Sequence, residues 1–151
     1  MAVHKLILDD VFDESVFTLI AIHCNIEDYR LAYLLNQFLG INLVRNEFDL
    51  DFNKGKTAYS LYQWKDKKKL INWNLVSNIC KINDFSQTNT NLLFAKVTNI
   101  TKTFNLIPEL KNDNYLLTIE DVLDSNEYKE IINKTLRIPQ VRTAYIVDYS
   151  Q

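Results

Sequence analysis

The chain has 151 residues, 47% of them hydrophobic, which fits one domain with its own buried core. Its 17 basic and 19 acidic residues give a net charge of -2, so no broad field of either sign attracts nucleic acid or anionic lipid. The two glycines stand apart, which excludes the glycine-rich phosphate loops of P-loop and dinucleotide-binding enzymes. Partners must therefore be selected by local features of the surface.

Cysteine usage and hydropathy favour a cytoplasmic protein. Cys24 and Cys80 lie far apart in apolar runs, so they predict neither a disulfide framework nor a metal-spaced pair. The first ten residues, MAVHKLILDD, hold too short an apolar core for a signal peptide. No apolar run approaches the roughly 20 residues that span a bilayer. We therefore expect no membrane partner.

The first predicted elements are a central strand and a helix. Residues 16–24, VFTLIAIHC, are almost unbroken in apolar and β-branched residues, as in a strand covered on both faces. Asn25 is the predicted N-cap, with Asp28 as its capping-box partner, and Gly40 is the predicted C-cap. The buried stripe of this helix consists of Leu31, Leu34, Leu35 and Phe38.

Three further strands are predicted in the middle of the chain. Residues 48–52, FDLDF, alternate as in a strand with one wet face, and residues 53–56 form the turn after it. Residues 57–64 and 70–80 read as an antiparallel hairpin joined by the polar run 65–69. The solvated face of its second strand should carry Asn72, Asn74 and Asn78.

The remaining elements alternate between loops and regular structure. Residues 84–91, DFSQTNTN, predict a loop or short linker, and residues 92–104 a weak strand or helix. A short strand is expected at residues 115–119 and a closing strand at 141–149. Between them, Asp124 and Glu127 form a capping box for a helix that ends near Ile138, before Pro139. Its buried stripe consists of Tyr128, Ile131, Ile132 and Leu136.

Together these elements predict one α+β domain spanning residues 1–151. We expect a two-layer sandwich, with a mixed or antiparallel sheet and two capped helices on one of its faces. A doubly wound sheet would need more helices than the sequence predicts.

The stretch IPELKNDNY, residues 107–115, predicts a corner of the fold. Pro108 fixes its own backbone angle and favours an extended Ile107, while the Asn/Asp run tolerates turn geometry. Glu109 could cap neighbouring amides or pair with Lys111, with ligand binding by Glu109, Asp113 and Tyr115 as the alternative.

Four segments, FTLIAIHC, EDYRLAYLLNQFLGINL, WNLVSNIC and IPELKN, together resemble the IPExxxDY proteins of Bacteroidetes. Ile107, Pro108 and Glu109 match the signature, Asp113 follows after three residues, and Asn114 precedes Tyr115. The resemblance implies a cytoplasmic bacterial protein and brings no substrate, cofactor or reaction with it.

One place in the sequence combines basic charge with aromatic rings. Lysines 65, 67, 68 and 69 bracket Asp66 at a hairpin tip, and Tyr62 and Trp64 precede them. Single-stranded RNA binders require this combination, since lysines bind phosphates and rings stack on bases. The alternative is a solubilising turn above core aromatics. The binding candidates are thus Tyr62, Trp64, Lys65, Lys67, Lys68, Lys69, Glu109, Asp113 and Tyr115.

Catalytic, metal and cofactor sites are not predicted. His23 and Cys24 are neighbours in a strand, so their side chains point to opposite faces and cannot form a nucleophile–base pair. Asp9, Asp10, Asp13 and Glu14 fit a solvated turn better than a calcium loop, because they lack its glycine and ligand spacing. The sequence favours a non-enzymatic protein-interaction module, with a protein partner or self-association. RNA binding at the hairpin tip, or an enzyme with an unrecognised pocket, are the alternatives.

Overall fold

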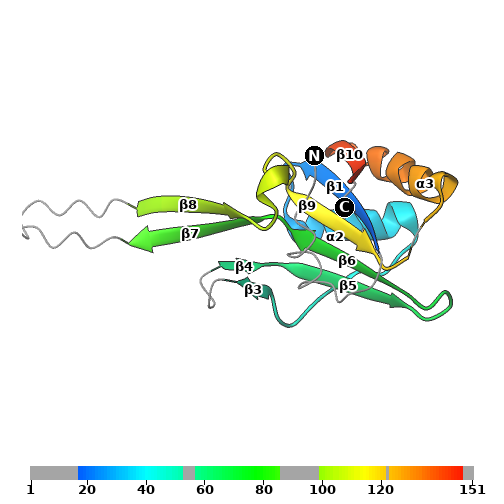
Figure 1. The fold of residues 1–151 in the computed structure, drawn as a ribbon, viewed down its shortest axis with the longest axis horizontal. Helices are drawn as coiled ribbons and strands as arrows, with labels where there is room; N and C mark the ends of the chain where they lie inside the picture. Colours follow the sequence, from blue (N-terminus) through cyan, green and yellow to red (C-terminus); the bar gives the residue numbers. More distant parts are fainter. Residues whose placement is uncertain (1–16, 53–56, 86–98, 122, 148–151) are drawn as a thin grey trace, which may run out of the picture.

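The protein has an α+β fold built around a six-stranded sheet (Figure 1). The computed structural model describes residues 17–52, 57–85, 99–121 and 123–147. Neighbouring strands of this sheet all pair antiparallel. Across the sheet the order is β10 (Val141–Val147), β1 (Thr18–Cys24), β9 (Tyr115–Ile119), β6 (Ile71–Ser77), β5 (Leu61–Asp66) and β2 (Val44–Arg45). The predicted fold class is confirmed, and the sheet is antiparallel.

β1 lies in the interior of the sheet because its sequence suits burial on both faces. It pairs with β10 on one side and with β9 on the other. Six of its seven residues are buried, and His23 is half-buried. The prediction of a central strand is therefore confirmed.

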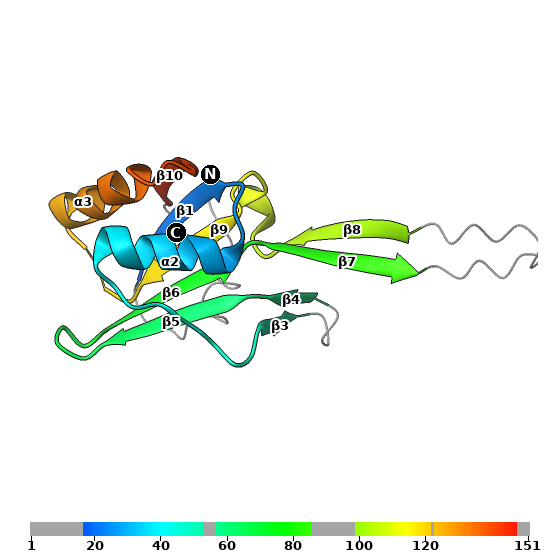
Figure 2. The same ribbon diagram turned by 180° about the vertical axis from the view of Figure 1, so that it is seen from behind.

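Both α-helices in the described part of the chain pack on the same face of the sheet, as predicted. α2 (Asp28–Leu39) buries Leu31 and Leu35, while α3 (Ser125–Leu136) contributes the half-buried Ile131 and Ile132. These side chains join one core cluster with alternate residues of β1, β9 and β6. In Figure 2 α2 lies in front of the sheet, with α3 near β10.

The predicted cap of the first helix is wrong at one end and confirmed at the other. The N-cap of α2 is Glu27 rather than Asn25, and its side chain makes no capping hydrogen bond. The strand ends at Cys24, and the chain runs through Asn25 and Ile26 before the helix begins. Gly40 is the C-cap, with a φ of 68° that costs glycine little.

α3 has the predicted capping box. The Asp124 side chain accepts from the backbone N–H groups of Asn126 and Glu127, and the Glu127 side chain accepts from the N–H of Asp124. Leu136 was expected in the buried stripe but is 43% exposed, and Thr135 is buried instead. The apolar stripe therefore ends before the last turn of the helix.

The opposite face of the sheet carries a second, smaller core. Leu19, Ala21, Val76 and Leu116 contribute to this core from three strands. The predicted corner supplies its cover, because the short 3-10 helix η1 (Pro108–Leu110) and the residues before it bury Leu106, Ile107 and Leu110 there. The corner is thus a packed structural element.

The asparagine-bearing face of β6 is not solvated as expected. Asn74 is 2% exposed and Asn78 fully buried, while Asn72 is half-buried. The Asn74 side chain donates to Thr118 Oγ1 at 3.2 Å and accepts from Gln63 Nε2 at 2.9 Å. The alternating pattern predicted that Asn74 would be exposed to solvent, but it is buried, and side chains on the two neighbouring strands satisfy its hydrogen bonds.

Residues 57–64 and 70–80 were each expected to form one strand, and both are divided. The first becomes β4 (Thr57–Tyr59) and β5, and β4 pairs with β3 (Leu50–Phe52) in a separate two-stranded sheet. The second becomes β6 and β7 (Ile79–Phe85), with Asn78 between them. β7 pairs with β8 (Asn99–Asn105), and this hairpin extends away from the main sheet (Figure 1).

Asn78 holds the point at which the chain leaves the sheet. Its Nδ2 donates to the carbonyls of Leu110 at 2.9 Å and Asp113 at 3.0 Å, and its Oδ1 accepts from the N–H of Ile107 at 2.7 Å. Its backbone N–H donates to the Asn114 carbonyl at 2.8 Å, and its carbonyl accepts from the N–H of Leu106 at 2.9 Å. One buried side chain thus fixes the whole corner.

Several sequence predictions fall outside the described residues. They concern the carboxylates at 9, 10, 13 and 14, the turn at 53–56, most of the predicted loop at 84–91, and the last two residues of the closing strand. Among the described residues, no helix is long and apolar enough to cross a membrane.

Replacing Asn78 by alanine should strongly destabilise the fold. Two carbonyls and one N–H of the corner would lose their buried partner, so we expect the free energy of unfolding to fall by about 3 to 5 kcal/mol. Urea unfolding followed by tyrosine and tryptophan fluorescence measures this.

An Asn78→Asp variant should also be destabilised, because a carboxylate keeps the acceptor but cannot donate to the two carbonyls. Asn112→Ala, at an exposed position of the same turn, is the control and should stay within about 0.5 kcal/mol of the parent. Equal stability of the Asn78 and Asn112 variants would contradict the role given to Asn78.

Candidate functional site at the turn before β9

Asp113 and Tyr115 of the predicted site, and Asn114 between them, contact three different elements. Asp113 is bound by β10, Asn114 by the end of β1, and Tyr115 by the loop between β1 and α2. Their side chains diverge because η1 ends just before them and β9 begins at Tyr115. The site is therefore a junction of elements that are far apart in the sequence.

Asp113 pairs with a tyrosine, but not with the neighbouring Tyr115. It is 4% exposed, and its Oδ2 accepts a short hydrogen bond from the hydroxyl of Tyr145. Tyr145 lies opposite Ala21 in the β1–β10 register. Burial and this hydrogen bond raise the pKa of Tyr145 to about 12.

Asn114 ties the turn to the end of β1. Its Oδ1 accepts from Nδ1 of His23 at 2.9 Å and from the backbone N–H of Cys24 at 3.1 Å. Because the backbone donor fixes the amide orientation, His23 must carry a proton on Nδ1. His23 therefore serves this junction, and its role here is structural.

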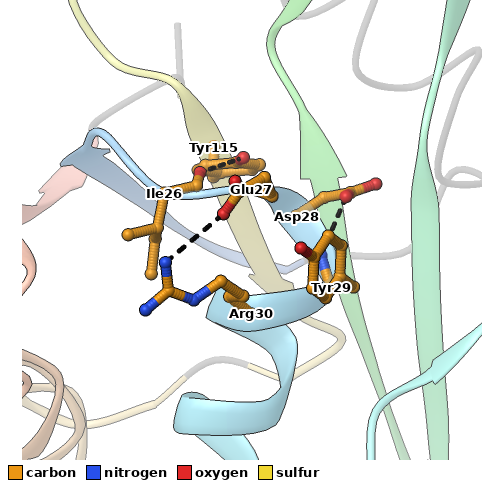
Figure 3. Close-up of polar contacts among 6 residues, drawn as sticks. All are labelled: Ile26, Glu27, Asp28, Tyr29, Arg30 and Tyr115. Carbon is orange, nitrogen blue, oxygen red and sulfur yellow. Dashed lines mark hydrogen bonds and ion pairs between the residues drawn. The ribbon is translucent and has the colours of Figure 1, made fainter.

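Tyr115 anchors the loop that leads into α2. Its ring is 8% exposed, and its hydroxyl donates to the Ile26 carbonyl at 2.6 Å (Figure 3). Burial is the main cause of the raised pKa of Tyr115, and the nearby carboxylates of Asp28 and Glu27 add to it, so its phenol stays neutral. Figure 3 also shows the Arg30–Glu27 ion pair at 3.6 Å beside this contact.

A cleft of about 550 Å³ opens next to this junction, within the usual size range of ligand sites. It lies between the β1–α2 loop and the base of the projecting hairpin. Its lining consists of Cys24, Asn25, Ile26, Glu27, Ser77, Ile79, Lys81, Asn114 and Tyr115.

The lining of the cleft suits binding better than catalysis. Burial raises the pKa of the Cys24 thiol, which keeps it protonated, whereas a nucleophilic cysteine needs a lowered pKa. The Ser77 hydroxyl is used locally, donating to the Ile79 carbonyl at 3.0 Å. The exposed charged groups at the cleft are Glu27 and Lys81.

The other predicted site, the lysine-rich tip, lies far from this junction. Lys65, Lys67, Lys68 and Lys69 are exposed around the β5–β6 turn. In Figure 1 this turn lies at the right end of the sheet, whereas the β7–β8 hairpin extends to the left. The predicted residues thus form two separate surfaces. Glu109 belongs to the surface at the turn before β9, where it is half-buried in η1.

The aromatic residues near the lysines pack inward. Tyr62 is 7% exposed and belongs to the core cluster under the helices. Trp64 is half-buried against the same cluster, with its ring centroid 6.2 Å from that of Trp73. Arg45 covers the Tyr62 ring at 5.5 Å. These rings therefore stabilise the core, and base stacking on them would require local unfolding.

Sequence reasoning missed Asn78, Asn114 and Tyr145. Asn78 interrupts an apolar run, and a polar residue in such a run signals a buried hydrogen-bonding role. Tyr145 lies 32 residues from Asp113 in the sequence, and no local pattern connects them.

Comparisons of this chain with protein-family models, curated proteins and solved structures found no match.

Replacing Tyr145 by phenylalanine should destabilise the protein in a pH-dependent way. Near neutral pH the loss of the donor to buried Asp113 should cost about 1 to 3 kcal/mol. The pKa of Tyr145 is raised from 10.0 to about 12 in the folded state, so the stabilisation by its neutral phenol is complete below pH 10. It is lost as the pH rises toward 12. The stability difference between the parent and Y145F should therefore shrink over that window.

Urea unfolding at a series of pH values measures this difference. Tyr29→Phe is the control, because Tyr29 is 59% exposed, and its curve should follow that of the parent. A Y145F difference that is constant from neutral pH to pH 12 would contradict the assignment. A double-mutant cycle with Asp113→Ala should give a coupling energy of about 1 kcal/mol or more.

Proposed function

We propose that this chain is a protein-interaction module, with the β7–β8 hairpin as its docking element. The observation that carries the proposal is the position of the hairpin, which extends away from the main sheet as a separate two-stranded ribbon (Figure 1). Neither strand pairs with a further strand among the described residues.

A ribbon of this kind gains much from a partner. A two-stranded hairpin is at best marginally stable in water, and each outer edge presents unpaired backbone donors and acceptors. β7 and β8 pair over seven consecutive positions without a register shift, and neither contains a proline. The bulges and prolines that commonly protect an edge against pairing are thus missing from these two strands.

The described side chains of the hairpin fit a mixed protein interface. Phe104 is 37% exposed and lies opposite Cys80 in the register, so the two share one face. Lys81 and Lys102 are exposed on opposite faces of the ribbon. Aromatic anchors with a polar surround are typical of protein interfaces.

Two alternatives have weaker support. RNA binding at the β5–β6 turn is supported by four exposed lysines, but Tyr62 and Trp64 pack against the core and are not exposed beside these lysines. An enzyme could use the cleft, but Cys24 is held protonated and Tyr115 is engaged with the backbone. A ligand in the cleft would still touch Lys81 at the base of the hairpin.

We also propose a cytoplasmic location and, from the sequence resemblance, a place in the IPExxxDY family. Two free thiols, with Cys24 buried and Cys80 half-buried, suit a reducing compartment.

Site-specific photo-crosslinking in cells tests the docking element. A benzoylphenylalanine residue at position 104 should give a discrete protein adduct, because the hairpin contacts the partner. The matched control is the same residue at position 33, since Tyr33 is also aromatic and is 60% exposed on α2. Nonspecific crosslinking should be more frequent at position 33, because Tyr33 is more exposed than Phe104. An adduct that forms only at position 104 therefore supports the proposal.

The adduct mass separates the possible partners. An adduct of purified protein at twice the chain mass shows self-association, and a heavier or lighter adduct found only in cells shows a different protein. Equal labelling at positions 104 and 33, or an adduct removed by ribonuclease, would count against a protein-docking hairpin.

A further inference from the structure

The turn between β5 and β6, residues 66–70, is a rigid projection with an unusual apolar residue at its end. Asp66 Oδ1 accepts from the backbone N–H groups of Lys68 at 3.0 Å and Lys69 at 3.3 Å. This local cap fixes the turn without help from the core. Leu70 then leads into β6.

Leu70 is doubly unfavourable in its position. Its φ of 57° places it in the left-handed region, which glycine or asparagine occupies at much lower cost. Its side chain is also 88% exposed, the highest value among the large hydrophobic residues of the described chain. Folding and solubility would both favour a different residue here, which indicates that the leucine side chain is used in an interaction.

The charge around Leu70 is strongly positive over a short distance. Four lysines and one aspartate between positions 65 and 69 give a local charge of +3. Besides Asp66, the acidic groups near the turn include Glu120, which accepts from Asn72 Nδ2 at 2.7 Å, and Glu130 of α3, whose pKa is lowered mainly by Lys134 and also by Lys69. Lys134 pairs with Glu130 at 3.0 Å, so this carboxylate is already largely compensated.

We propose that the β5–β6 turn binds the surface of anionic phospholipid membranes. The four lysines contact the headgroups, and Leu70 inserts its aliphatic side chain into the interfacial layer. The net charge of -2 on the whole chain does not prevent this, because the turn lies at one end of the sheet and carries a local charge of +3. Surface binding requires no membrane-spanning helix.

The same turn fits nucleic acid less well. Single-stranded RNA would need exposed rings for stacking, and Tyr62 and Trp64 pack toward the helices. An exposed leucine supplies no stacking surface, whereas it partitions readily into lipid. The observed side chains therefore favour a bilayer surface as the partner.

Vesicle co-sedimentation at low salt tests the proposal, with equal parts phosphatidylcholine and phosphatidylglycerol against pure phosphatidylcholine. The parent protein should bind only the anionic vesicles. Each lysine contributes about fivefold, so replacing all four tip lysines by glutamine should weaken binding on the order of several hundredfold. The control carries the same charge change, by glutamine at the exposed Lys111, Lys129, Arg137 and Arg142, and should bind nearly as the parent does.

Leu70→Asn separates binding from folding. Asparagine tolerates the left-handed backbone, so we expect the Tm to rise by about 2 to 4 °C. Vesicle binding should nevertheless fall about tenfold, because the inserted side chain is lost. A variant that is at least as stable as the parent and binds less cannot be explained by misfolding.

Three outcomes would overturn the proposal. The parent protein could fail to bind anionic vesicles at low salt, or the tip and control lysine variants could lose binding equally. A single-stranded RNA 20-mer could also bind through the four lysines, unaffected by Leu70→Asn, while vesicles do not bind. The hairpin crosslinking at position 104 is independent of all three.

Discussion

The side-chain amide of Asn78 determines where the main sheet ends. A buried asparagine must satisfy both its N–H donors and its carbonyl, and Asn78 does so on the backbone of the corner formed by residues 107–113. Its own backbone bonds to Leu106 and Asn114 as well. The chain cannot continue β6 through this position, because the residue is committed to the corner. It leaves the sheet instead and forms the projecting β7–β8 hairpin.

The corner then orders the residues that follow it. Asp113, Asn114 and Tyr115 reach β10, β1 and the loop before α2, so a single turn connects three segments distant in sequence. Two of these contacts hold a tyrosine hydroxyl in a hydrogen bond, and burial is the main cause of the raised pKa of both tyrosines. Asp113, Asn114 and Tyr115 therefore join distant parts of the fold, and the neighbouring cleft lies where this turn and the β1–α2 loop meet.

The sequence predicted most of the regular elements, because their signals are local. The apolar run of β1, the glycine after α2 and the capping box of α3 all act within a few residues. The break at Asn78 was not predictable in this way, because the partners that hold its side chain lie 29 to 35 residues away in the sequence. The Asp113–Tyr145 pair likewise depends on strand order. The left-handed backbone of Leu70 had no sequence signal, because turns normally place glycine or asparagine there.

Packing covers both faces of the main sheet and leaves projecting segments at its two ends. Helices α2 and α3 cover one face of the sheet, and the corner with its neighbours supplies a core on the other. Predicted binding residues within these layers, such as Tyr62 and Tyr115, are already committed to packing or to buried hydrogen bonds. What extends beyond the layers is the hairpin at one end and the lysine-bearing turn at the other. Both extensions carry features that folding alone does not require, namely strand edges without a bulge or proline in one and an exposed leucine with a left-handed backbone in the other. The two proposed interactions would therefore use opposite ends of the molecule and require no rearrangement of its core.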